Sequence, residues 1–178
     1  MKRSLMAAAA AFSVTLSAAA AIATPAPASA QAAAIPDFPA PKVFGTSFQR
    51  DPGHDFTKRI RSRKDGILRG WITHVSGSTA EYEPIRWKRA EHTGGHFVGP
   101  PEGDVTAYAS PVAANVVYLS AHGCGRAGAE PTVSPRTGLG VERCSRAALL
   151  RNAKKHRTPA LITVHKGKIV KFQEIYTP

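Results

Sequence analysis

Apolar and polar positions alternate over several short stretches after residue 65, which is typical of β-strands with one buried face. Within residues 67–75, Ile67, Trp71 and Val75 fall on one face of a strand at period two. A Ser-Gly-Ser turn signal and a second apolar stretch with one proline follow directly. The pattern therefore predicts a β-hairpin at the start of the domain.

Three further elements are indicated in the second half of the chain. Residues 112–121 are apolar on both faces, as expected of a central strand. Ser145 is placed to cap a helix over residues 146–156, whose last residues are basic. Lys166-Gly167 separates two apolar stretches and predicts a tight hairpin turn near the C-terminus.

These elements predict one β-rich domain over residues 65–178. Five or six strands and a single helix indicate an α+β fold that is mostly β. Two architectures fit this balance: a small curved sheet packed on the helix, or an OB-like barrel that the helix plugs at one end. Both alternatives include the C-terminal β-hairpin.

The first 30 residues have the pattern of an export signal. Lys2 and Arg3 precede an alanine-rich apolar run, and Ala28-Ser29-Ala30 is a small-x-small sequence that a signal peptidase accepts. We expect cleavage after Ala30, no transmembrane anchor in the cleaved chain, and a secreted, extracellular protein. The sequence does not indicate its oligomeric state.

Residues 31–64 are rich in proline and end in a basic run, which predicts a flexible arm next to the domain. The chain carries 24 basic and 12 acidic side chains; loss of residues 1–30 leaves 22 against 12, a net charge of +10. A surplus of this size attracts polyanions or serves solubility alone. The basic side chains of the arm are candidate binding residues: Lys58, Arg59, Arg61, Arg63 and Lys64.

Cys124 and Cys144 are the only cysteines. In an exported protein an even number of cysteines favours a disulfide over free thiols. The residues between them are rich in glycine and proline, so we expect a disulfide-closed loop that exposes residues 132–136 to a partner.

Two tryptophans and one carboxylate are further candidate binding residues. Trp71 and Trp87, together with Tyr82, would offer a stacking platform for sugars or bases if they did not anchor the core. Glu174 falls on an apolar strand face, where a carboxylate needs a cation or hydrogen-bond donors, or else its pKa rises. An ion pair with an arginine is the structural alternative to a functional acid.

The sequence offers little support for catalysis or metal binding. His92 and His96 have the spacing of a zinc pair, but two glycines lie between them and no third ligand is evident. His122 and Cys124 resemble a base and a nucleophile, but a disulfide would remove the thiolate. We therefore expect no metal, no cofactor and no catalytic residues.

Part of the chain resembles small secreted proteins and lipoproteins of Gram-positive bacteria that have no assigned function. The similar residues are Gly70-Trp71-Ile72, Val75, Gly77 and the stretch 82–87. The predicted hairpin at residues 164–170 and the C-terminal residues 174–178 are also similar to those of these proteins. This resemblance implies a secreted β-rich domain and names no catalytic residue.

Three functions remain open on the sequence. The first is a non-enzymatic binding module for anionic polymers of the cell envelope or the extracellular space. The second is a secreted inhibitor or protein-interaction module that presents the disulfide-closed loop to an extracellular protein. The third, a small hydrolase using Glu174 or histidines, has only generic residues behind it.

Overall fold

A computed structural model describes residues 34–49, 51–92 and 94–177, all within one compact unit that spans Ala32–Pro178. The predicted export signal, residues 1–30, lies outside the described residues. Across the described part of the chain, no helix has the length and hydropathy that a membrane crossing requires.

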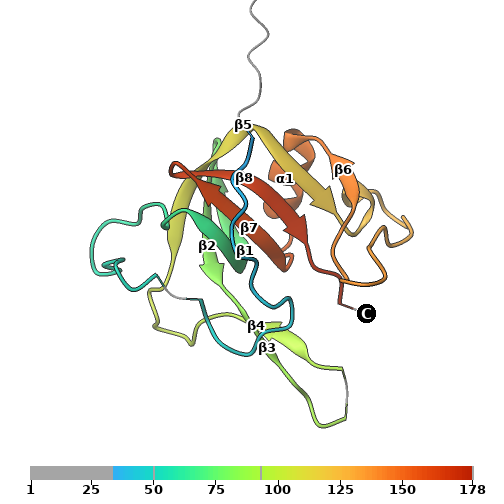
Figure 1. Ribbon diagram of the computed structural model, residues 1–178, viewed down its shortest axis with the longest axis horizontal. Coiled ribbons are helices and arrows are strands. Elements are labelled where there is room, and N and C mark those ends of the chain that lie inside the picture. The colour runs from blue at the N-terminus through green and yellow to red at the C-terminus, as the bar shows by residue number, and fades with distance from the viewer. Residues whose placement is uncertain (1–33, 50, 93, 178) are drawn as a thin grey trace, which may run out of the picture. The chain divides into compact units, whose positions relative to one another are not determined.

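Five strands close into a small barrel (Figure 1). The order around it is β2-β1-β7-β8-β5, and pairing of β5 with β2 completes the circle. Only the β5–β8 pair is parallel. Of the two predicted architectures, the structure has the barrel. The five strands are β1 (Gly66–Ser76), β2 (Thr79–Pro84), β5 (Tyr108–Ser120), β7 (Ala160–His165) and β8 (Lys168–Glu174).

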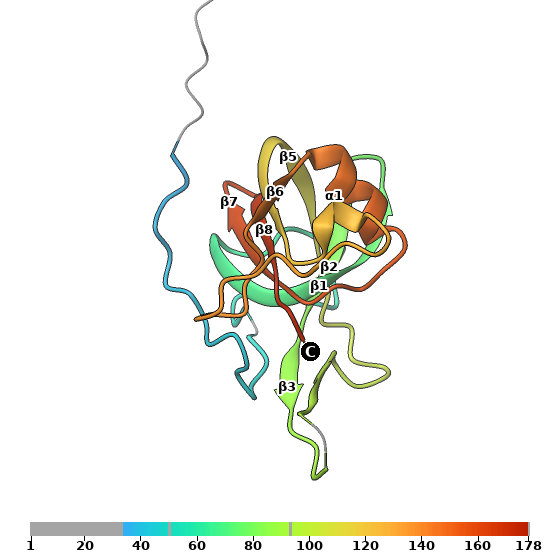
Figure 2. The same cartoon turned by 90° about the vertical axis from the view of Figure 1, so that its right-hand side faces the viewer.

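In the part of the chain that the structure describes, three short strands lie outside the closed barrel. Strand β6 (Glu142–Cys144) pairs with the end of β5. Strands β3 (Arg86–Lys88) and β4 (His96–Val98) form a separate two-stranded ribbon, which projects from one side of the barrel in both views (Figures 1 and 2). The second apolar stretch of the sequence, residues 79–87, predicts one return strand that includes most of β3, whereas the glycine- and proline-rich residues 91–104, which contain β4, predict a loop.

Helix α1 (Arg146–Ala153) packs into the barrel core. Ser145 caps it, since the Ser145 hydroxyl accepts a hydrogen bond from the backbone N–H of Ala148 at 3.1 Å. Ala148 and Leu149 are buried in the same apolar cluster as the inward residues of β1, β5, β7 and β8. The helix ends at Ala153, three residues before the predicted end, so the basic residues 154–156 follow it.

The inward face of β1 differs from the predicted one. Leu68, Ile72 and Val75 face the main core, whereas Ile67 and Trp71 pack on a second cluster outside the barrel. A register shift between Ile72 and His74 explains the odd spacing, because a bulge turns the following residues to the other face. The prediction that Ile67, Trp71 and Val75 share one face of the strand was therefore wrong.

The predicted C-terminal hairpin is present. Strands β7 and β8 pair antiparallel, and Lys166 and Gly167 both have positive φ angles, of 50° and 71°. Two such residues between paired strands form the turn type that suits the strand twist.

The described residues of the proline-rich segment before β1 contain no helix or strand, and the segment lies against the barrel. Arg69 of β1 is 2% exposed, and its guanidinium donates hydrogen bonds to three backbone carbonyls. Two of these carbonyls belong to the segment, Lys42 at 2.5 Å and Ser47 at 2.6 Å; the third is Ile85 at 3.0 Å. The expected flexible arm is thus held along much of its length by the domain.

Candidate functional site

The basic end of the arm is fixed to the barrel by its backbone. Ala109 of β5 donates a hydrogen bond to the Arg61 carbonyl at 3.0 Å, and the Arg63 N–H donates to the Tyr82 hydroxyl at 3.3 Å. Between them, the Ser110 hydroxyl donates to that of Ser62 at 2.8 Å. These contacts leave the side chains of Arg59 and Arg61 exposed to solvent.

Asp51 strengthens this attachment from a buried position. Its carboxylate accepts hydrogen bonds from the backbone N–H of Lys64 at 2.9 Å and of Gly53 at 3.3 Å. Burial opposes ionisation of Asp51, but these bonds and the charges of Lys64 and Arg63 outweigh it and lower its pKa. The Lys64 ammonium lies 3.6 Å from the same carboxylate.

The arm end also meets the turn between β7 and β8. The Asp65 carboxylate lies 2.9 Å from Nδ1 of His165. Hydrogen bonding to the Lys166 backbone, above all, and to His165 lowers the pKa of Asp65. Ser62 lies beside Gly167, since a Cβ added at Gly167 would meet its side chain at 3.9 Å. Two segments that are 100 residues apart therefore share one end of the barrel.

We call the cations of these two segments, together with Arg143, which lines a pocket with Lys166 and Lys168, the basic surface. Among the described residues, Lys58 and Lys64 pair with Asp55 and Asp51, whereas the other cations of this surface have no ion-pair partner. Arg63 is half-buried, and its Nε has no hydrogen-bond partner in the described part of the chain. The surface comprises Lys58, Arg59, Arg61, Arg63 and Lys64 of the arm with Arg143, Lys166 and Lys168.

The sequence predicted only the arm's share of this surface. Lys166 was assigned to the hairpin turn, Lys168 to the strand after it, and Arg143 to the cysteine-closed loop. The lysines on both sides of Gly167 indicated that this turn is exposed. The sequence could not indicate that the folded barrel places the turn next to Ser62 and Asp65. A pocket of about 470 Å³ adjoins it, lined in part by Arg143, His165, Lys166 and Lys168.

The tryptophans and Tyr82 do not form a shared platform. Tyr82 is fully buried inside the barrel, where its hydroxyl hydrogen bonds to Ser110 at 2.9 Å. Trp71 packs outside, and its Nε1 donates to Glu83 at 2.5 Å. Trp87 instead contacts two phenylalanine rings, those of Phe44 and Phe97, each with centroids 4.9 Å away.

Glu174 is 3% exposed and has neutral donors as partners instead of an arginine. The Tyr118 hydroxyl donates to its Oε1 at 2.5 Å, and the Ser120 hydroxyl and the Ala121 N–H donate to its Oε2 at 2.8 and 2.7 Å. Asn152 of α1 donates to the Tyr118 oxygen at 3.1 Å. Burial, with the nearby carboxylate, raises the pKa of Tyr118, so the phenol stays protonated.

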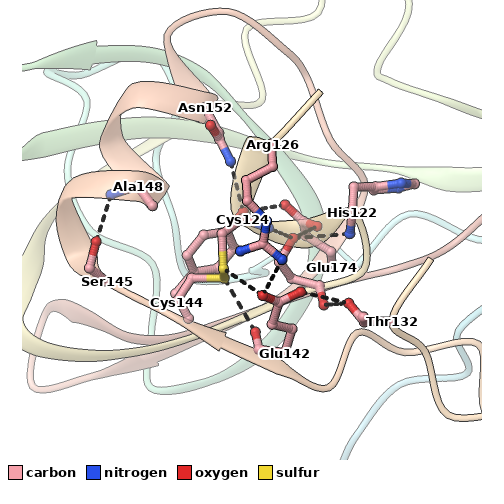
Figure 3. Close-up of a disulfide and its surroundings, with 12 residues drawn as sticks. His122, Cys124, Arg126, Thr132, Glu142, Cys144, Ser145, Ala148, Asn152 and Glu174 are labelled. Atoms are coloured by element: carbon pink, nitrogen blue, oxygen red, sulfur yellow. Dashed lines mark hydrogen bonds and ion pairs between the residues drawn. A yellow bond between two sulfur atoms is a disulfide. The ribbon is translucent and has the colours of Figure 1, made fainter. Parts of the chain in front are cut away.

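This network supports the disulfide turn (Figure 3). The Ser120 hydroxyl, which donates a hydrogen bond to Glu174, also accepts two hydrogen bonds. They come from the backbone N–H groups of His122 and Cys124, at 3.0 and 3.2 Å. Cys124, at a positive φ of 59°, is bonded to Cys144, as predicted, with Cα atoms 5.7 Å apart. Glu174 therefore joins the end of β8 to the loop that follows β5.

A second pocket, of about 400 Å³, lies beside this network, where α1 ends. Arg126, Lys155 and two histidines, His122 and His156, line it together with Glu174. Arg126 is paired with Glu142 at 2.8 Å. Within the described residues no histidine ring hydrogen bonds to a hydroxyl.

Two other segments considered in the sequence analysis can be placed. His92 and His96 are exposed, and no group of three or more metal-ligating side chains occurs among the described residues. In the disulfide-closed loop, Thr132 is half-buried, and its hydroxyl donates to the Ser120 carbonyl and to Glu142, each at 3.3 Å. Of the expected segment 132–136, residues 132–134 are half-buried, whereas Pro135 and Arg136 are exposed, as is the following Thr137.

Comparison with known proteins adds no assignment to this geometry. No protein-family model, curated protein or solved structure matches the chain.

Proposed function

We propose that this protein is a secreted, non-enzymatic module that binds anionic polymers through the basic surface. One observation carries the proposal: the contacts of Asp65 and Ser62 with the β7–β8 turn unite the arm's cations with Lys166 and Lys168. Cations fixed on a rigid scaffold bind a polyanion at a lower entropic cost than the same cations on a free arm.

The described carboxylates near this surface do not cancel its charge. Asp51 and Asp55 each face one lysine, and Asp65 is engaged by His165 and backbone groups. Arg59, Arg61, Lys166 and Lys168 stay exposed and available to phosphate, sulfate or carboxylate groups. Export, which the N-terminal sequence predicts and the disulfide favours, brings the surface to envelope and extracellular polymers.

Retention on heparin and on isolated cell wall across a salt gradient tests the proposal. Two double variants divide the surface: Arg59→Gln with Arg61→Gln, and Lys166→Gln with Lys168→Gln. Each should elute at lower salt than the parent and flatten the dependence of log affinity on log salt by about two units, because each cation that binds the polymer contributes about one unit to that slope.

The matched control carries the same loss of charge elsewhere. Arg151 on α1 and Lys154 after it are exposed, so Arg151→Gln with Lys154→Gln removes two charges without touching the surface. This control should elute close to the parent. If all three double variants elute together, net charge alone governs retention and the proposed surface is wrong.

The disulfide-closed loop supports a second candidate function, binding to an extracellular protein. Its tip exposes Arg136, and the turn is fixed because Gly138 and Thr137 donate backbone hydrogen bonds to the Ser134 carbonyl at 2.8 and 3.2 Å. Such a turn presents one side chain in a defined position. If this function holds, a partner captured from culture medium should be lost with Arg136→Ala and kept by both basic-surface variants.

A further inference from the structure

The barrel wall is interrupted next to the basic surface. In the parallel pair of β5 and β8, Val112 is opposite Ile169 and Val117 is opposite Lys171. Four residues of β5, 113–116, therefore face a single residue of β8, Val170. Val170 has no register partner on β7 either. Both strands bulge at the same place, and bulges in a sheet are frequent beside binding sites.

The interruption opens into the pocket of about 470 Å³. Small and branched apolar side chains line part of it: Ala113, Ala114, Val117 and Val170, with Ile35 from the arm. Pockets of this volume hold small ligands, and an apolar lining with a few polar groups is their usual composition. Here two alanines leave space where larger side chains would fill the gap.

Three of the five polar side chains that line the pocket are cations, and the other two are Asn115 and His165. Arg143, Lys166 and Lys168 line the pocket and have no ion-pair partner among the described residues. Asp65, the acidic group beside the turn, is engaged by His165 and by the Lys166 backbone, so it leaves the two lysine ammonium groups unpaired. The pocket thus combines an apolar wall with cations beside it.

We infer that the pocket binds an amphiphilic anion, namely an alkyl chain that carries a phosphate group. The chain would displace water from the alanines and valines, and the phosphate would face Lys166, Lys168 and Arg143. A bare polyanion would leave the apolar wall in water, and a neutral alkyl ligand would leave the cations without a partner. The inference rests on the proposed function, since it gives the same surface a preference for polymers with a lipid-linked end.

Calorimetric titration with three probes tests this inference. Decyl phosphate, kept below its micelle concentration, contains both parts; decyl glucoside has the chain alone, and glycerol phosphate has the charged group alone. We expect decyl phosphate to bind at least about tenfold more tightly than either, a difference of about 1.4 kcal/mol. Equal affinity for decyl phosphate and glycerol phosphate would show that the apolar wall contributes nothing, and would overturn the inference.

A filling variant separates this inference from the proposed function. Ala114 is exposed, so Ala114→Phe obstructs the pocket without entering the core; Ala147→Phe on the exposed face of α1 is its control. Ala114→Phe should weaken decyl phosphate binding at least about tenfold and leave heparin retention unchanged. Unchanged decyl phosphate binding by Ala114→Phe would overturn the inference, whereas loss of heparin retention only in the basic-surface variants would still support the proposed function.

Discussion

The Asp65 carboxylate lies 2.9 Å from Nδ1 of His165, and this contact pins the end of the arm to the β7–β8 turn. Both side chains are partly exposed, so the contact contributes less than about 1 kcal/mol to the free energy of unfolding. Its effect is on position, because it helps to hold the end of the arm next to the β7–β8 turn.

Replacing Asp65 with alanine should therefore free the arm end without unfolding the barrel. We expect faster hydrogen exchange at the amides of residues 61–66 and a melting temperature within a few degrees of the parent's. Hydrogen exchange followed by mass spectrometry measures the first effect. Unchanged exchange at these amides would show that the Ser62 and Arg63 contacts suffice to hold the segment.

Asp51 should make stability depend on pH in the acid range. Its folded-state pKa is lowered, so its contribution is fully present above the ordinary value of 3.8 and is lost as the pH falls through the lower folded value. Asp51→Asn should cost about 1–3 kcal/mol at pH 7, because one buried donor loses its acceptor. Thermal unfolding of both proteins between pH 2 and 7 should show this difference shrinking below about pH 4. A difference that stays constant would contradict the ionised, hydrogen-bonded state of Asp51.

Arg69 should be irreplaceable by lysine. Its planar guanidinium serves three carbonyls in different directions, and a lysine ammonium cannot reproduce that geometry. Arg69→Lys should lower the free energy of unfolding by about 2–4 kcal/mol and release residues 42–49 to proteases. Arg151→Lys, at an exposed position, is the control and should be neutral. Equal protease resistance of the Arg69 and Arg151 variants would show that other contacts hold the segment.

The sequence predicted where strands and the helix occur better than it predicted which face of a strand is buried. The β7–β8 hairpin and the Ser145 cap follow from local chemistry, a glycine turn and a hydroxyl before an apolar run, and both are present. Bulges in β1 and at Val170 depend on pairing with distant strands, so the side-chain period cannot reveal them. The same limit explains why the residues of β1 that face the barrel core were predicted wrongly.

Tertiary contacts also decided which candidate residues come together. Composition identified the basic arm, but its charge alone could not indicate that Ser62 and Asp65 lie against the β7–β8 turn. Arg69 did not stand out in the sequence, because only the structure shows three carbonyls converging on it. Proline content indicates extended chain correctly, but it does not tell whether that chain is free or bound to a barrel.

Loss of the disulfide should weaken the whole domain. Cys124 and Cys144 are 20 positions apart, and chain entropy assigns about 3 kcal/mol to a loop of this length. Cys144→Ser should lower the free energy of unfolding by that order, measured by urea denaturation without reductant. Adding reductant should lower the free energy of unfolding of the parent to that of the variant. It should leave the free energy of unfolding of a double serine variant unchanged. If reductant leaves the stability of the parent unchanged, the Cys124–Cys144 disulfide is contradicted.

Glu174 and Tyr118 should act as one unit in folding. Tyr118→Phe removes the donor to Oε1 and the acceptor of Asn152, so it should cost about 1–3 kcal/mol. Glu174→Gln keeps an oxygen for Ser120 and Ala121 and turns an amide toward the tyrosine oxygen, so its cost should be smaller than that of Glu174→Ala.

A double-mutant cycle with Tyr118→Phe and Glu174→Gln decides whether the two residues are coupled. Groups that share a buried hydrogen bond show interaction energies of about 0.5–3 kcal/mol, whereas separate sites are additive within about 0.5 kcal/mol. We expect non-additive costs in urea denaturation, together with an unchanged salt dependence of heparin retention, because neither residue belongs to the basic surface. Additive costs would show that the 2.5 Å contact contributes little energy. A change in heparin retention would instead connect the buried carboxylate to binding and reopen a functional role for Glu174.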